Sequence, residues 1–230
     1  MDKVMERFFN QALGKEAFEE DASRGQRVYA QLVQYRFEEV ITKAFPLLTR
    51  EVDKTLLNKA IAAFMHQGTQ SPYIWEVPRY FWEFEKEHHL INLPFVDDLM
   101  WYEWIEVELM MATYAPPPKE PFSWEKEWRL DESVRIRKLN YRVFESAFTQ
   151  QRPCFFIAWF DHTSRITCYK EVAEVIYRLL ELLTCKPFNE TLQSLSQEAD
   201  TTESELKLYL TSALEALCEE GIIVSKGETP

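Results

Sequence analysis

Glycine is scarce in this chain of 230 residues, with only five occurrences, and no run of eighteen apolar residues is present that would span a bilayer. The first nine residues contain acidic side chains and lack a long apolar core, so they do not resemble a signal peptide. We therefore predict a cytoplasmic protein with no membrane partner. With five Gly and eleven Pro, the chain also leaves little room for a low-complexity linker.

Basic residues are in the minority, because 26 Lys and Arg are outnumbered by 38 Asp and Glu. The formal net charge of −12 argues against a broad attraction to nucleic acid or to an anionic membrane, since like charges repel. A local basic patch stays compatible with this total.

Motifs for catalysis and for metal binding are also lacking. The sequence contains no nucleophile–base motif, no phosphate loop and no Glu-x-x-His pair of the di-iron kind. Cys154, Cys168, Cys185 and Cys218 lie far apart and form no Cys-x-x-Cys pair, which favours buried thiols over a metal site. We predict a protein that is not an enzyme and that holds no cofactor or metal.

Apolar residues make up 46% of the chain and aromatic residues 14%, which is enough for packed cores. Apolar side chains at helical spacing predict about five helices before the proline run at 116–118. These helices are expected near residues 2–13, 26–44, 53–67, 75–87 and 95–114. The second of them carries an apolar stripe of Val28, Leu32, Tyr35, Val40 and Ile41.

The C-terminal part is predicted to be a winged-helix-like domain over residues 133–230. Apolar patterns predict a strand over 133–144 and a hairpin of 153–160 with 165–169. Three helices are expected over 171–183, 189–199 and 203–220, followed by a closing strand over 222–224. With an N-terminal helical bundle at 1–115 and a connector at 116–132, the predicted fold class is mainly α with a small β component (α+β).

Several short motifs occur in an order that is typical of one bacterial family. They are Arg27-Val-Tyr29, Phe45-Pro46, Ser71-Pro72, Leu93-Pro-Phe95, and Asp98-Leu99 followed by Glu103-Trp104. In their order and spacing the chain resembles the HvfC/BufC-type family, which also carries an older label as a DNA-binding domain. The resemblance covers most of the chain, because the C-terminal part fits the two-domain plan of the family.

This resemblance implies two competing functions. Members of the HvfC/BufC type are accessory partners of multinuclear iron-dependent oxidative enzymes, with which they modify cysteines in ribosomally made peptides (RiPP maturation). Two partners are thereby implied, an iron-dependent oxidative enzyme and a cysteine-bearing precursor peptide. The older label implies instead a transcriptional regulator that binds DNA.

The C-terminal module is also similar to the PqqD-type recognition domain of peptide-modifying systems, in its third helix and in its ending Glu219-Glu-Gly-Ile-Ile-Val224. Such domains capture a leader peptide as an added strand at the edge of a sheet. We expect a peptide to contact the hairpin through Phe156, Ala158, Phe160 and Ile166.

Docking on a partner enzyme is expected on the helix over 95–114. Tryptophan is enriched at protein contact surfaces, and this helix combines Trp101 and Trp104 with Glu103. The acidic residues of the same helix are otherwise interpreted as a solvated face opposite an apolar one.

The DNA alternative depends on one basic cluster. Its members are Arg129, Arg135, Arg137, Lys138 and Arg142. These side chains can bind phosphate or pair with the acidic remainder of the chain, and we favour pairing. The helix over 203–220 is a poor candidate for reading DNA, because it has five Glu against one Lys. We therefore favour a peptide-binding accessory protein over a DNA-binding regulator.

Overall fold

The computed structural model describes residues 23–68, 73–146, 148 and 150–226, together with six residues nearer the N-terminus. Those six are Arg7, Asn10, Gln11, Leu13, Lys15 and Glu16. The helix expected over 2–13 lies largely outside the described residues, and the Ser71-Pro72 motif lies wholly outside them. Two compact units make up the chain, one of residues 1–107 and 143–149 and the other of 108–142 and 150–230.

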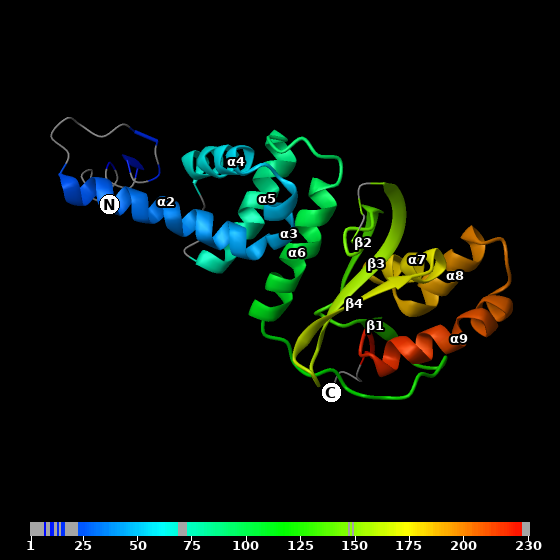
Figure 1. Cartoon of the computed structure of the whole chain (residues 1–230). Coiled ribbons are helices and arrows are strands. Elements are labelled where there is room, and N and C mark those ends of the chain that lie inside the picture. The colour runs from blue at the N-terminus through cyan, green and yellow to red at the C-terminus, as the bar shows by residue number, and fades with distance from the viewer. Residues whose placement is uncertain are drawn as a thin grey trace. The chain divides into compact units, whose positions relative to one another are not determined.

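The described elements of the first unit are helices, as the sequence predicts (Figure 1). They are α2 (Arg24–Ala44), α3 (Pro46–Glu51), α4 (Lys54–Gln67), the 3-10 helix η1 (Ile74–Glu76), α5 (Val77–His88) and α6 (Val96–Met111). The last turn of α6, from Glu108 onward, belongs to the second unit.

Local sequence signals determine where these helices begin and end. Ser23 accepts a hydrogen bond from the backbone N–H of Gln26, and the Gln26 side chain accepts one from the backbone N–H of Ser23, so a capping box begins α2. Pro46 ends α2 and begins α3, because proline is disfavoured inside a helix but fits its first turn. The side chain of Asp53 accepts from two backbone N–H groups of α4 and caps it.

Aromatic rings fill the core of the first unit. The ring centroid of Phe64 lies 5.5 Å from that of Phe81 and 5.6 Å from that of Phe84, and Phe45 lies 6.2 Å from Phe81. All four side chains are buried. Each such pair contributes about 0.5–1.5 kcal/mol beyond the burial of its surface, so one cluster holds α4, α5 and the junction between α2 and α3 together.

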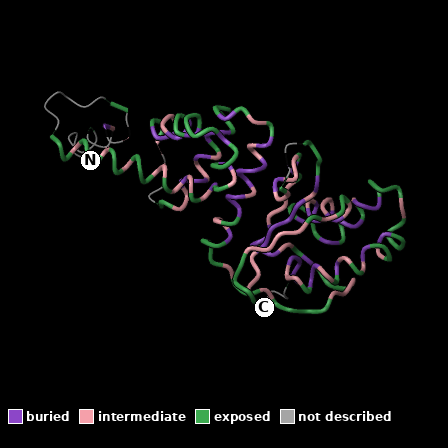
Figure 2. Tube along the Cα trace, in the orientation of Figure 1, coloured by how far each residue is buried: buried purple, intermediate pink, exposed green. Residues whose placement is uncertain are grey.

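The apolar stripe predicted on α2 is buried at only one of its five positions. Ile41 is fully buried, whereas Leu32 is 59% exposed and Tyr35 is 62% exposed. Figure 2 shows exposed residues along the first half of this helix. Helical spacing identifies the side chains that share a face, but it does not tell whether another element covers that face.

The second unit combines two antiparallel sheets with three helices (Figure 1). Its elements are β1 (Trp128–Leu130), β2 (Arg135–Tyr141), β3 (Gln151–Asp161), β4 (Ile166–Val172), α7 (Glu174–Leu183), α8 (Phe188–Glu198), α9 (Glu203–Glu219) and β5 (Ile223–Ser225). The predicted hairpin, the three helices and the closing strand are all present. The fold is thus mainly α with a small antiparallel β component, as predicted.

One face of the three-stranded sheet β2-β3-β4 packs on the helices. Ile157 and Trp159 of β3 point to this face and lie in one core with Leu179, Leu210 and Leu214 of the helices. Because side chains alternate along a strand, the residues between them point to the opposite face. We call these two sides of the sheet the helix face and the opposite face.

The structure differs from the predicted ranges in the region 116–132. This region belongs to the second unit rather than to a connector, since β1 lies within it and pairs with β5, with Trp128 opposite Ser225. The segment 143–149, expected in the C-terminal domain, belongs to the first unit, where the ring of Phe148 contacts that of Phe95 at 5.1 Å. Pairings between residues so far apart in the chain leave no local signal in the sequence.

Among the described residues, no helix is both long enough and apolar enough to cross a membrane.

The two ends of the α2 stripe are expected to respond differently to truncation. Ile41→Ala removes a fully buried side chain and should lower the free energy of unfolding by about 2–4 kcal/mol. Leu32→Ala removes an exposed side chain from the same helix and should change it by less than about 0.5 kcal/mol. Urea unfolding of both variants measures the difference. Equal losses would show that the whole stripe is covered.

Candidate functional site

The three residues predicted to dock a partner on α6 are buried. Trp104 is 1% exposed, and its indole ring stacks on that of Trp75 with a centroid distance of 6.4 Å and an interplanar angle of 4°. Trp101 and Glu103 are also buried. A buried side chain offers no surface to another protein, so the prediction that Trp101, Glu103 and Trp104 form a docking surface is wrong in this conformation.

Glu103 has a structural task inside the first unit. Its Oε1 accepts from the backbone N–H of Leu47 at 2.6 Å and its Oε2 from that of Leu48 at 3.1 Å. These N–H groups belong to the first turn of α3 and have no partner inside the helix, so Glu103 caps α3 from a distant part of the chain. Burial raises the pKa of Glu103 to about 7, although the two N–H donors favour the ionised form.

Glu106 is exposed, as expected, but three other carboxylates of α6 also depart from the expected solvated face. Asp98 is buried, and Asp97 accepts a hydrogen bond from Nε1 of Trp82 at 2.8 Å. Glu108 accepts from Nε of Arg135 at 2.8 Å. These acids are used within the fold, and α6 is therefore not a simple amphipathic helix.

The basic residues of the DNA alternative do not gather on one surface. Arg135 and Arg137 lie on the opposite face of β2, whereas Lys138 lies on its helix face, since neighbours in a strand alternate. Arg129 belongs to β1, which is part of the other sheet. A phosphate backbone would need these charges side by side.

Acidic side chains pair with Arg135 and with Arg142, both members of the predicted basic cluster. Arg135 pairs with Glu108, and Arg142 pairs with Glu171 of β4. The preferred interpretation of the cluster, pairing with the acidic remainder of the chain, agrees with both contacts. The basic residues are also spread over two sheets and over two faces of one sheet. They therefore do not form the continuous basic surface that the DNA alternative requires.

The residues predicted to bind a peptide divide between two strands. Phe156, Ala158 and Phe160 lie in β3, which pairs with β2 on one side and with β4 on the other. Phe156 and Ala158 are also buried. The backbones of Phe156 and Ala158 are therefore paired on both sides and that of Phe160 on the β4 side, so these three residues do not lie at the free edge of the sheet. Ile166, which is 52% exposed, begins β4 and keeps its place in the candidate site.

The order of the strand patterns in the sequence is itself a signal for this arrangement. Three successive strand patterns joined by short connections form an antiparallel meander, in which the middle strand is internal. The hairpin alone gave no reason to choose between its strands. Adding the strand over 133–144 would have placed the edge at 165–172.

β4 presents the free edge of this sheet. No strand among the described residues pairs with its outer side. Ile166, Cys168, Lys170 and Val172 point to the helix face, and Thr167 and Tyr169 to the opposite face. A strand edge carries unpaired backbone N–H and C=O groups, which are ready to pair with an extended chain. The candidate site is therefore the outer edge of Ile166–Val172.

The opposite edge, β2, is protected against pairing in ways that β4 is not. It carries Arg135, Arg137 and Lys138, and its register is irregular between Leu139 and Tyr141. Charged side chains and bulges are the devices by which proteins block strand edges. β4 carries one basic and one acidic residue, and the ammonium of its Lys170 is held by Glu220 at 2.7 and 2.9 Å. Pairing is therefore more favourable at β4.

The four cysteines are free thiols in different surroundings. Cys154 and Cys218 are buried, Cys168 is half-buried and Cys185 is exposed, so the prediction of buried thiols is wrong for Cys185. Burial raises the pKa of Cys218 to about 12 and also raises that of Cys168, which keeps both thiols protonated at neutral pH. In the part of the chain that the structure describes, no group of three or more His, Cys, Asp or Glu is placed to hold a metal ion.

No protein-family model and no curated protein matches this sequence. The resemblance to the HvfC/BufC-type family therefore stays a prediction.

Glu103 should make the stability of the first unit depend on pH. Because its pKa is higher in the folded state than the ordinary value of 4.5, the folded state binds more protons between pH 4.5 and about 7. The contribution of Glu103 to the free energy of unfolding is thus fully present below pH 4.5 and is lost as the pH rises through 7. The total loss is up to roughly 3 kcal/mol. Glu103→Gln does not titrate and should lack this loss.

Amide hydrogen exchange at Leu47 and Leu48, followed between about pH 5 and pH 8 and corrected for intrinsic exchange, reports on the same cap. In the wild type the protection factors should fall across this window, and in Glu103→Gln they should stay level. The same fall in both proteins would assign the pH dependence to another group.

Proposed function

We propose that this chain is a non-catalytic accessory protein whose second unit captures an extended peptide as a fourth strand on the outer edge of β4. The observation that carries this proposal is the free edge of Ile166–Val172 beside a blocked edge at β2. The resemblance to the HvfC/BufC-type family supplies the biological context. In that context the peptide is a ribosomally made precursor and its cysteines are modified by an iron-dependent oxidative enzyme.

The dimensions of β4 set the length of the captured segment. Seven residues of strand at about 3.3 Å each span roughly 23 Å. A peptide of about seven residues can therefore pair along the whole edge. Its backbone hydrogen bonds supply affinity, and its side chains on alternate positions supply selectivity.

The surroundings of β4 favour a peptide with a defined pattern. Ile166, Cys168 and Val172 form a row on the helix face that is interrupted by the charged Lys170, and Cys168 and Val172 pack against the buried core. A strand beside them would bring every second side chain next to this row. We expect apolar residues at those positions of the peptide and polar residues at the others.

Electrostatics support a peptide over DNA at this site. α8 contains no basic residue, and α9 has five Glu and one Lys if Glu220 is counted with it. This acidic surface would repel a phosphate backbone. A leader peptide that is neutral or basic meets no such barrier.

The proposal also includes docking on an iron-dependent oxidative enzyme, but it assigns no surface of the chain to this contact. The residues first expected for it, Trp101, Glu103 and Trp104, are buried. Co-purification of the chain with such an enzyme and its precursor peptide tests this part. Absence of a complex at micromolar concentrations would contradict it while leaving peptide capture by β4 to be tested by itself.

A pair of proline variants tests the edge of β4. Adjacent residues of an edge strand direct their N–H groups to opposite sides, so one of Thr167→Pro and Cys168→Pro removes an outward N–H and the other removes a bond to β3. The variant that keeps the native circular dichroism should lose peptide binding at least about tenfold. The other proline variant should disturb the sheet, which identifies the residue whose N–H group bonds to β3.

Binders for this experiment can be selected from displayed random peptides of about twelve residues. Their binding should shift the backbone amide NMR signals of β4 and leave those of β2 unchanged. Selected peptides that shift α8 and α9 instead, or that bind the fold-preserving proline variant equally well, would contradict capture at this edge. A DNA duplex serves as the comparison and is expected to leave β4 unshifted.

A further inference from the structure

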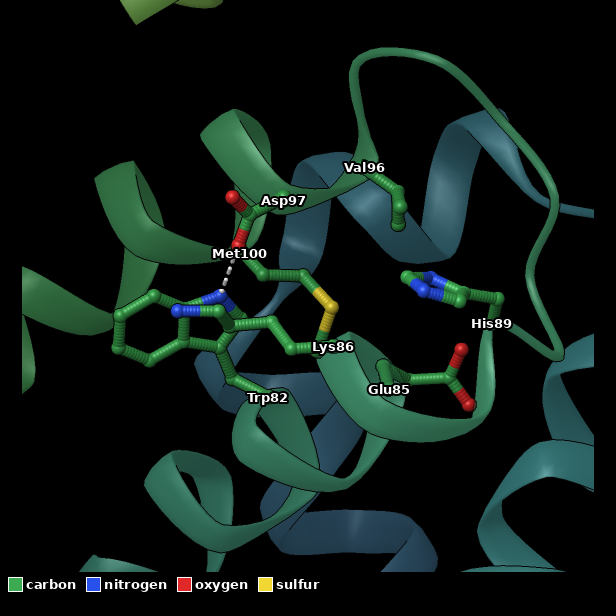
Figure 3. Close-up of a pocket in the computed structure, with 7 residues that line it drawn as sticks. All are labelled: Trp82, Glu85, Lys86, His89, Val96, Asp97 and Met100. Carbon is green, nitrogen blue, oxygen red and sulfur yellow. Dashed lines mark hydrogen bonds between the residues drawn. The ribbon is translucent and has the colours of Figure 1, made fainter. Parts of the chain in front are cut away.

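A small pocket lies at the C-terminal end of α5 in the first unit. Its volume is about 140 Å³. The residues that line it come from α5, from the turn that follows and from the first turns of α6: Trp82, Glu85, Lys86, His89, Val96, Asp97 and Met100 (Figure 3). The proposed function makes no use of this pocket.

Glu85 is the polar group that makes this pocket unusual. Glu85 is only 3% exposed, and its Oε2 accepts a hydrogen bond from the backbone N–H of Ile91 at 2.9 Å. Its Oε1 is buried and has no hydrogen-bond partner among the described residues. A buried acceptor without a partner costs about 1–3 kcal/mol, so a donor that enters the pocket would recover this free energy.

Carboxyl groups dominate the polar side of the pocket, although burial raises the pKa of Glu85 above its ordinary value. Asp97 adds a second carboxylate, held in place by Nε1 of Trp82 at 2.8 Å (Figure 3). α5 ends at His88, and the free carbonyl groups of a helix C-terminus carry a partial negative charge. Two carboxylates and a helix C-terminus together favour a positively charged ligand.

Lys86 shows that the indole of Trp82 attracts an ammonium group. Its Nζ lies 4.9 Å from the ring centroid, which is the geometry of a cation–π contact. Lys86 is exposed, so its long side chain can turn to the solvent when another cation enters. Lys86 and the exposed His89 are the basic residues that face the pocket, and Lys86 would compete with a cationic ligand.

The apolar walls limit the size of the ligand. Met100 is buried, and Trp82 and Val96 are half-buried beside it. A cavity of about 150 Å³ lined by apolar side chains accommodates a molecule as large as benzene. The carbon skeleton that fits here therefore has about four to six carbons.

We propose that this pocket binds a small organic ammonium ion. Its N–H donates to Oε1 of Glu85, and its short carbon chain lies against Trp82 and Met100. Asp97 and the end of α5 stabilise the positive charge from the other sides. The site is separate from β4, so it stands or falls independently of the proposed function.

Three probes of one size separate charge from shape. n-Butylammonium, n-butanol and butyrate are titrated at about pH 7.5 while the NMR signal of the Trp82 indole N–H, assigned with Trp82→Phe, is followed. Butylammonium should bind with a Kd on the order of 1 mM, as expected for five non-hydrogen atoms, and the other two at least about tenfold more weakly. Equal binding of butanol or butyrate, or no shift at about 50 mM butylammonium, would overturn the proposal.

Variants of α5 locate the site. Glu85→Gln should weaken butylammonium at least about tenfold, because the charge that faces the pocket is removed. Lys86→Met should strengthen it about threefold or more by removing the competing cation. Glu87→Gln removes an exposed carboxylate from the same helix and should leave the Kd unchanged. Tighter binding by Lys86→Met tests the site even where Glu85→Gln does not fold, and a Kd unchanged by Lys86→Met would contradict it.

Discussion

The pairing of β3 with a neighbour on each side determines what the second unit can offer to another molecule. β2 and β4 flank β3, and its central residues 155–158 pair on both sides, so the middle of the most apolar strand is used inside the sheet. The edge that is left free belongs to β4, which is short and carries two charged residues. A strand edge binds polypeptide backbone and not phosphate, and for this reason peptide capture follows from the topology more directly than DNA binding does.

Two buried glutamates in the first unit differ in how fully their carboxylate oxygens are hydrogen-bonded. Glu103 has a backbone donor for each oxygen and holds the start of α3 against α6. Glu85 has a donor for one oxygen, and its other oxygen is orphaned in a pocket. Because a fold gains nothing from an unsatisfied acceptor, such a group is a candidate for ligand recognition, whereas the fully satisfied Glu103 is a candidate for stability alone.

Much of the fold was predictable because its signals are local. Asp53 begins α4, the Thr202 capping box begins α9, and Gly221, with a φ of 75°, stands where α9 ends. The pairing of Trp128 with Ser225 and the cap that Glu103 provides to Leu47 join residues far apart, and no local pattern reports them. The candidate site was predicted only in part, since apolar alternation locates strands but does not show which of them is internal.

Hydrogen exchange of the amides of β3 and β4, in the free protein and with a selected peptide bound, tests the central claim most directly. In the free protein the account predicts protection throughout the paired part of β3, and in β4 an alternation of protected and rapidly exchanging amides, as a strand with one free side requires. The bound peptide should protect the rapidly exchanging amides of β4. Uniform protection of β4 in the free protein, or peptide-induced protection confined to other elements, would contradict the account.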